Sequence, residues 1–439
     1  MKAIFPTRRK KLGLSVALVL LAALLSAGCA TNPVTGQTQL AFMSVQEEIA
    51  TGVQNYPQTT QMHDGLVPNS NRLQAYVSGL GHRLAGVSHR PDLPWEFNVV
   101  NASAINAYAL PGGKISVTRG LVNRLENEDQ LAFVLAHEVG HVSARHHVSQ
   151  HATGVLVNLA IAGLGVGLAV SDSRYTGVGL AVAGVAGALL MTSYSRDQER
   201  QSDELGYLYM TRAGYNPRAM LGVFQVFLSM QRGEPSAVER LFHSHPLPVE
   251  RIEYARQMVT RASPSLTGRP FITNNFRAGA AQVKQRAHAY AAMDQGNAYL
   301  GRKQYGRAAQ GFREAIRAYG GEGLFYSRLA LAELGQNRVG QAVAHARRGA
   351  GLSPGVFSVR YVAGQVFRQS GDYAAAARAH AAADRLLPSH PVNKFFVAYN
   401  LERIGQTNQA RVYYRQVMAI SPQSEAGKVA AKRLVAIGY

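Results

Sequence analysis

The stretch Leu131-Ala-Phe-Val-Leu-Ala-His137-Glu138-Val-Gly-His141 decides how the rest of this chain is interpreted. Histidines four residues apart lie on one face of an α-helix, one turn from each other. Two such imidazoles can hold Zn²⁺, and a glutamate after the first can deprotonate a zinc-bound water. The alternative is a helix that carries two histidines by chance. The apolar residues before His137 and a capping spacing at Asn127 to Gln130 predict a buried helix, which gives metal ligands rigid support.

A catalytic zinc site needs a third protein ligand and a further position for water. Ser195 begins a second predicted helix by a capping box, and Glu199 and Asp203 lie four residues apart on it. We predict that Glu199 is the third ligand and that Asp203 fixes the tautomer of a ligand histidine, His137. Without the upstream motif, an ordinary charged helix face would be the better interpretation.

Taken together, these motifs resemble the gluzincin zinc metalloproteases of the HtpX and CAAX-prenyl-protease family. The matching pattern is His137-Glu-x-x-His141 followed by Glu199-x-x-x-Asp203. The segment Asn106-Ala107-Tyr-Ala-Leu-Pro111-Gly112-Gly113 is similar to that family's edge strand. The pair His245-Pro246 with Arg251 is similar to its histidine loop. Ser202 departs from the family, which usually has alanine there.

The resemblance implies an α+β zincin-like metalloprotease domain, mostly helical with a small sheet, and one Zn²⁺ per chain. Its metal ligands would be His137, His141 and Glu199, with Glu138 as the general base. His245 would either stabilise the oxyanion or reach the metal as a fourth ligand and keep the enzyme latent. Arg251 is a candidate for transition-state stabilisation.

The same resemblance makes the segment from Asn106 to Gly113 the strand that holds an extended substrate. The residues themselves predict strands at 95–100, 105–110 and 114–118, the last two joined by Pro111-Gly112-Gly113. An exposed edge strand can pair with a substrate backbone, whereas a plain hairpin needs no such partner. An amphipathic helix is predicted around Leu73 to Leu84.

Two apolar runs, 154–170 and 176–191, are rich in glycine and alanine. Each is shorter than the ~20 residues of a membrane-spanning helix. Three interpretations remain open: a helical hairpin near the active site, a hairpin that dips into a membrane surface, or two true spans as in an integral membrane protease. His146, His147 and His151 precede these runs, and we expect them to form a solvated basic turn. Of His243 and His245 further on, the resemblance singles out His245.

The start of the chain is typical of a secretory leader. Residues 1–28 combine basic residues with an apolar run, and Cys29, the only cysteine, follows directly. We predict a lipoprotein signal peptide, acylation of Cys29 and a periplasmic protein anchored to the outer membrane. Simple cleavage or a retained anchor are the alternatives. Five of the 46 basic residues lie in the leader, which leaves 41 against 26 acidic residues, a net charge of +15.

A 34-residue step repeats through the last third of the chain. One column of it holds Tyr305, Val339, Tyr373 and Thr407, another Ala308, Ala342, Ala376 and Ala410, and a third Pro354, Pro388 and Pro422. Asn337, Gly371 and Gly405 fill a turn position that suits a left-handed residue. This spacing predicts an all-α tetratricopeptide solenoid of four helix pairs with a final capping helix from Glu425.

We therefore expect a metalloprotease domain at 29–262, a linker at 263–288 and repeats at 289–439. The repeats hold 20 basic and 8 acidic residues, a net charge of +12, which favours an acidic envelope protein as partner. The expected function is a zinc-dependent endopeptidase in outer-membrane protein quality control or assembly. The resemblance implies that its substrates are unfolded or stalled outer-membrane proteins. Its membrane contact would be the lipid anchor, and no nucleic acid is expected. The rival hypotheses are a chaperone or adaptor with a latent zinc site, and an integral membrane protease.

Overall fold

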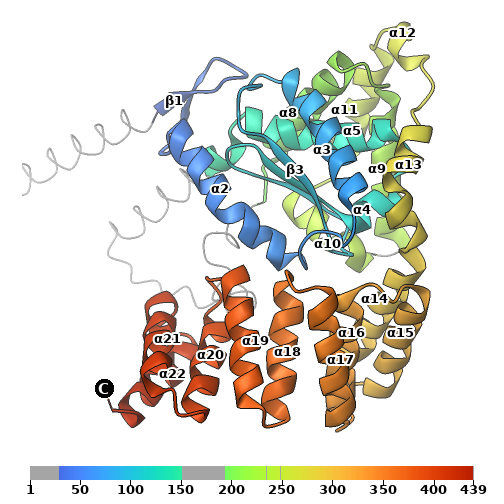
Figure 1. The fold of residues 1–439 in the computed structure, drawn as a ribbon. Helices are drawn as coiled ribbons and strands as arrows, with labels where there is room; N and C mark the ends of the chain where they lie inside the picture. Colours follow the sequence, from blue (N-terminus) through green and yellow to red (C-terminus); the bar gives the residue numbers. More distant parts are fainter. Residues whose placement is uncertain (1–28, 151–192, 234, 248, 439) are drawn as a thin grey trace, which may run out of the picture.

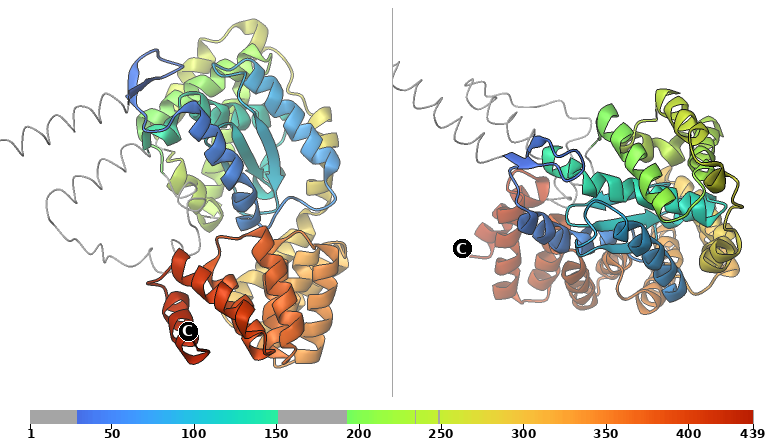
Figure 2. Two further views of the ribbon diagram at one scale, coloured as in Figure 1. Left: turned by 60° about the vertical axis from the view of Figure 1, so that its left-hand side comes forward. Right: turned by 90° about the horizontal axis from the view of Figure 1, so that it is seen from above.

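The computed structural model describes residues 29–150, 193–233, 235–247 and 249–438. An α+β unit is followed by an all-α solenoid, as predicted (Figure 1). The solenoid lies along one side of the α+β unit, as further views confirm (Figure 2). The predicted leader and the apolar runs at 154–170 and 176–191 lie outside the described residues, so their interpretations stay predictions. No helix in the described ranges is long and apolar enough to cross a membrane.

A three-stranded sheet of order β3-β5-β4 lies within the α+β unit. The predicted hairpin is formed by β4 (Ala107–Leu110) and β5 (Lys114–Thr118), while β3 (Glu96–Val100) pairs with β5 in parallel. Among the described strands β4 is an edge, but all four of its residues are buried. The edge is therefore not exposed in this structure, and its pairing with a substrate backbone stays a prediction. A separate small hairpin joins β1 (Cys29–Thr31) and β2 (Thr38–Leu40).

Helices surround this sheet and build one continuous core. The predicted amphipathic helix is α3, which packs on β3 through Leu73, Val77, Leu80 and Leu84, each at most 1% exposed. Every residue of α5 is buried, so the helix that carries His137 crosses the core. The helices of this unit are α2 (Val45–Met62), α3 (Asn71–Gly86), α4 (Arg119–Arg124), α5 (Glu128–Ser143), α8 (Arg196–Arg212), α9 (Arg218–Gly233), α10 (Pro235–Ser244) and α11 (Val249–Thr260).

Two glycines allow α5 and α8 to pack closely. A Cβ on Gly140 would lie 3.1 Å from the Cβ of Leu205, and one on Gly206 would lie 3.2 Å from the Cα of His137. Both contacts are tight for a real side chain, so the helices come nearer than an alanine pair would allow. This approach brings the first turn of α8, with Glu199, to the two histidines of α5.

The turn Pro111-Gly112-Gly113 packs against α2 and Trp95. Gly112 and Gly113 have φ angles of +71° and +86°, a region that favours glycine. A Cβ on Gly112 would lie 2.6 Å from the Cα of Ile49, and one on Gly113 would lie 3.0 Å from the ring of Trp95. These glycines are therefore required by the turn itself, whatever else they contact.

The solenoid contains four helix pairs and a final helix, as predicted. The four positions of the first repeat column are the first residues of the second helix in each pair, and the four alanines are 0% exposed. The predicted left-handed turns have φ angles of +59° at Asn337, +83° at Gly371 and +79° at Gly405. Lys303 fills the same slot in the first pair with φ +57°, which its residue type did not indicate. The helices are α14 (Ala287–Gly301), α15 (Tyr305–Ala318), α16 (Gly323–Gly335), α17 (Val339–Leu352), α18 (Phe357–Gln369), α19 (Tyr373–Leu386), α20 (Pro391–Arg403), α21 (Thr407–Ile420) and α22 (Glu425–Ala436).

The segment between the two units is itself folded. It contains α12 (Pro264–Thr267) and α13 (Asn274–Gln285). Helix α13 packs on α3 and α4, and its Phe276 and Val283 belong to the core of the α+β unit, each 1% exposed. Removing α13 would therefore open that core.

Candidate metal centre

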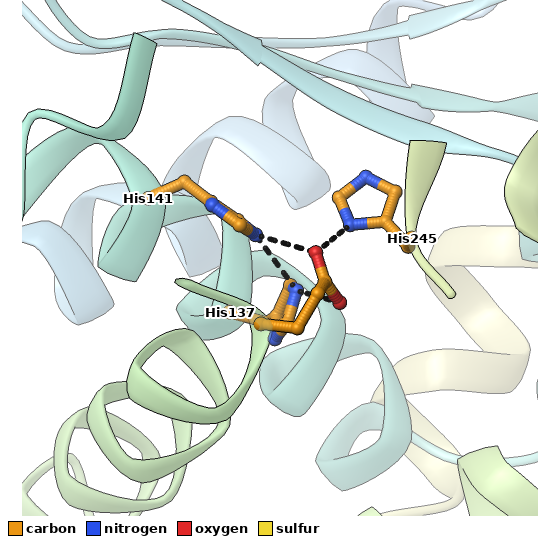
Figure 3. Close-up of side chains that lie close together, drawn as sticks. His137, His141 and His245 are labelled. Atoms are coloured by element: carbon orange, nitrogen blue, oxygen red, sulfur yellow. Dashed lines mark hydrogen bonds and ion pairs between the residues drawn. The ribbon is translucent and has the colours of Figure 1, made fainter. Parts of the chain in front are cut away.

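Four buried side chains converge between α5, α8 and the loop after α10. His137 and His141 come from α5, Glu199 from α8, and His245 follows α10. One ligand atom from each lies within 4.8 Å of the others, so this group could hold a metal ion. The three imidazole rings turn toward a shared point (Figure 3).

The separations between these atoms suit a tetrahedral metal site. Nε2 of His137 lies 3.0 Å from Nε2 of His141. The Glu199 carboxylate lies 3.3 Å from Nε2 of His141 and 3.7 Å from Nε2 of His137. Nδ1 of His245 lies 2.8 Å from Oε1 of Glu199. Ligand atoms about 2.1 Å from a tetrahedral zinc lie about 3.4 Å apart, so the observed distances bracket the required value.

The hydrogen-bond chemistry also favours a cation between these residues. Nδ1 of His137 lies 3.0 Å from Oδ1 of Asp203, and an ionised carboxylate can only accept a hydrogen. The Asp203 carboxylate therefore favours the tautomer with hydrogen on Nδ1, in which the lone pair of Nε2 points toward Nε2 of His141 and the Glu199 carboxylate. Two imidazole lone pairs that face each other beside a carboxylate oxygen in a buried space form a donor set that a cation would satisfy.

Glu138 has the surroundings of a general base. It is 2% exposed, and its Oε2 has no hydrogen-bond partner among the described residues. Burial raises the pKa of the Glu138 carboxyl above its ordinary value. Burial also raises the pKa of Glu199, but the positive charges of His245 and Arg251 outweigh it and hold the pKa well below the ordinary range. Glu199 is therefore the stable anion and Glu138 the better proton acceptor.

Comparison with known proteins agrees with this geometry. Residues 71–259 match the family described as Peptidase family M48. These residues are an M48 peptidase domain. The HtpX and CAAX-protease resemblance is a broader label for the same group.

The chain is 28% identical over 240 residues to the beta-barrel assembly-enhancing protease of Yersinia pestis, which is 54% of this chain and 48% of that protein. The Escherichia coli K12 protein of that name is 28% identical over 239 residues, 53% of this chain and 48% of that protein. The mitochondrial metalloendopeptidase OMA1 of Arabidopsis thaliana is 37% identical over 142 residues, 32% of this chain and 27% of that protein. The chain spans about half the length of the first of these relatives. The crystal structure of YrrB, a TPR protein with an unusual peptide-binding site, has 20% identity and a TM-score of 0.30, covering 36% of this chain and 80% of that one.

Arg251, on α11, binds the Asp203 and Glu199 carboxylates of α8. Its Nε and Nη2 donate to Asp203 at 2.8 Å each, its Nη1 donates to the Pro246 carbonyl at 2.6 Å, and it also pairs with Glu199. Arg251 is 8% exposed. The sequence proposed it for transition-state stabilisation, whereas every described polar contact holds a carboxylate or the histidine loop in place.

The predicted substrate strand reaches the metal centre at one end only. Ala107 lines a cavity beside His137 and Glu138, whereas the turn at 111–113 packs on α2. The backbone N–H of Asn106 donates to Oγ1 of Thr118 at 3.1 Å. The cavity walls are mainly apolar, and they include Leu121, Phe133, Val134, Val223, Phe224, Phe227, Leu241, Phe242 and Leu247.

Three residues near the centre were not identified from the sequence. His146 and His147 are 3% and 7% exposed, so the predicted solvated turn was wrong, while His151 lies outside the described residues. Tyr194 stacks on His141 with ring centroids 3.6 Å apart, and its hydroxyl lies 2.6 Å from Nε2 of His147. None of the three shares a helical spacing with the motif, which is why sequence pattern did not find them. His243 is exposed, in contrast to His245.

Proposed function

We propose that this chain is a zinc-dependent endopeptidase of the bacterial envelope that acts in outer-membrane protein quality control or assembly. The observation that carries the proposal is the convergence of His137, His141 and Glu199 beside Glu138, whose Oε2 has no hydrogen-bond partner among the described residues. The M48 domain and the names of the relatives from Yersinia pestis and Escherichia coli support it.

One zinc ion would be held by His137, His141 and Glu199. Zinc in such a site supplies Lewis-acid chemistry, polarising the scissile carbonyl and making water more acidic. Glu138 takes a proton from the attacking water and later passes it to the leaving amine. Asp203 holds His137 with Nε2 free to bind, and Arg251 holds Asp203 and Glu199.

The substrate would lie along β4 at the Asn106 and Ala107 end. The apolar cavity beside Glu138 would take an apolar side chain next to the scissile bond. All four residues of β4 are buried in the described structure. The residues that cover this strand must therefore move before a substrate can pair with it. Unfolded or stalled outer-membrane proteins, which expose extended apolar segments, suit such a site.

His245 favours a latent form of this enzyme. Its Nδ1 lies 2.8 Å from Oε1 of Glu199 and inside the group of ligand atoms, where water would otherwise bind. Its Nε2 lies 3.8 Å from Oε1 of Glu138. With a metal bound, His245 would have to give up this hydrogen bond to Glu199 to act as a fourth ligand, and its withdrawal would then open the site. A chaperone or adaptor role with a capped metal site is the second candidate that this contact supports.

The remaining parts of the proposal rest on the sequence. The division into a metalloprotease domain at 29–262, a linker at 263–288 and repeats at 289–439 is part of it, with α13 of the linker packed on the metalloprotease core. So is acylation of Cys29 after removal of residues 1–28, with anchoring to the outer membrane on its periplasmic side. The basic repeats, with a net charge of +12, would bind an acidic envelope protein.

The test is Glu138→Gln in the purified chain beginning at Cys29. This change removes the base and no ligand, so the variant keeps zinc while cleavage of an unfolded protein such as casein falls by ~10²–10⁴-fold. Metal analysis and gel-based proteolysis measure the two quantities. A parental chain without zinc, or a variant that cleaves at the parental rate, would refute the mechanism.

A further inference from the structure

His146 is a buried histidine that the proposed reaction does not use. It follows α5 and lies against the far side of the ligand His141. Its Nδ1 is 2.8 Å from Nδ1 of His141, and its Nε2 is 2.8 Å from Oε1 of Gln201 on α8. The hydroxyl of Ser202, the residue at which this chain departs from the related family, lies 3.4 Å from Nδ1 of His146.

The contact with Gln201 determines which nitrogen of each ring carries hydrogen. An amide oxygen can only accept, so Nε2 of His146 is the donor in that contact. Nδ1 of His146 then holds a lone pair, and a hydrogen bond between the two Nδ1 atoms requires that Nδ1 of His141 donates. His141 is left with a free lone pair on Nε2, on the side of His137 and Glu199.

A reversed polarity would give the opposite result. If residue 201 donated to His146, His146 would donate to Nδ1 of His141, and the hydrogen of His141 would lie on Nε2. That nitrogen could not bind a metal, because a ligand imidazole needs its lone pair. The acceptor at residue 201 thus selects the metal-binding tautomer of His141 through one intervening ring.

We propose that His146 and Gln201 form a positioning relay that holds His141 in its metal-binding tautomer and orientation, as Asp203 does for His137. The inference rests on the proposed metal centre. Each ligand histidine of α5 then has its own partner, one a carboxylate and the other a second imidazole backed by an amide.

The experiment measures the dissociation constant for Zn²⁺ of the full chain by competition with a chromogenic chelator, at fixed pH. His146→Leu removes the acceptor and should weaken zinc binding ~10–100-fold, as is typical for outer partners of metal ligands. His146→Asn places an amide oxygen near the position of Nδ1 and should restore most of the affinity. If His146 served only to fill space, His146→Asn would not bind zinc more tightly than His146→Leu.

Gln201 supplies a matched pair of variants. Gln201→Glu keeps an acceptor and should retain or tighten zinc binding, whereas Gln201→Lys offers only donors and should weaken it. Circular dichroism and thermal unfolding show that each variant is folded. Parental affinity in folded His146→Leu, or equal affinity of the Glu and Lys variants, would overturn the relay while leaving the metal centre intact. A parental chain that binds no zinc would refute the proposed function itself.

Discussion

Glu199 and Asp203 lie one turn apart on α8, and their contacts differ. Glu199 faces the two Nε2 atoms, whereas Asp203 lies behind His137 and pairs with Arg251. We expect Glu199→Ala to abolish stable zinc binding because it removes a ligand. Asp203→Ala should weaken it by ~10–100-fold, since it disturbs only the orientation of a ligand. Metal content after dialysis against a chelator measures both, and full occupancy in Glu199→Ala would remove Glu199 from the ligand set.

At the scale of the elements, the distance between α5 and α8 controls the metal centre. Gly206→Ala would place a methyl group 3.2 Å from the Cα of His137, so one helix must shift by a few tenths of an ångström. We expect weaker zinc binding, roughly tenfold, because ligand geometry tolerates little displacement. Gly79→Ala is the control: this helical glycine of α3 is exposed with no neighbour within 4 Å, and alanine there should stabilise the fold by about 0.5–1 kcal/mol. Unchanged zinc affinity in Gly206→Ala would contradict the packing argument.

The helices of the solenoid carry a buried histidine that makes their stability depend on pH. His380 of α19 is 0% exposed, and its Nδ1 lies 2.9 Å from Oδ1 of Asn393. Burial lowers the pKa of His380 to about 4. The unfolded chain, with a pKa near 6.5, therefore takes up the proton first as the pH falls. The contribution of neutral, buried His380 to the unfolding free energy is complete above pH ~6.5 and is lost as the pH falls toward 4.

His380 should accordingly cost about 2 kcal/mol of unfolding free energy between pH 7.5 and pH 5.0. Over this pH range we expect the unfolding free energy of His380→Gln to fall by about 2 kcal/mol less than that of the parent. Urea unfolding at the two pH values measures both. His288→Gln, at an exposed histidine of α14, is the control and should follow the parent. Parallel losses in His380→Gln and the parent would show that His380 is not the titrating group.

At the scale of the whole molecule, a buried polar junction joins the solenoid to the M48 domain. Glu322, 1% exposed, accepts hydrogen bonds from Asn101 at 3.1 Å and from Tyr290 at 2.8 Å. The guanidinium of Arg119, 3.4 Å above the Tyr290 ring, donates to Asn101. Asn101 follows β3 and Arg119 follows β5, so the repeats contact the sheet that positions β4.

Glu322→Ala should lower the unfolding free energy by about 1–3 kcal/mol, because it leaves buried polar groups without partners. Glu314→Ala, at a partly exposed site on α15, should change it by less than about 0.5 kcal/mol. Denaturant titration followed by fluorescence and by circular dichroism measures both. A Glu322→Ala variant as stable as the parent would mean that the junction contributes nothing to the association of the two units.

The local sequence pattern was sufficient to predict the features that depend on residues close together in the chain. The spacing of His137 and His141, the capping box at Ser195 and the 34-residue columns each reflect a fixed helical geometry, and the predicted helices and solenoid follow from them. The pairing of α5 with α8 could be proposed because both carried ligand types in helical register.

Only the tertiary structure decided the contacts between elements distant in sequence. Burial of β4, the relay from Gln201 through His146, and the junction at Glu322 depend on how separate elements pack, and no periodicity within one element encodes them. A histidine that follows a helix looks solvated in sequence, because its burial comes from another helix 55 residues away.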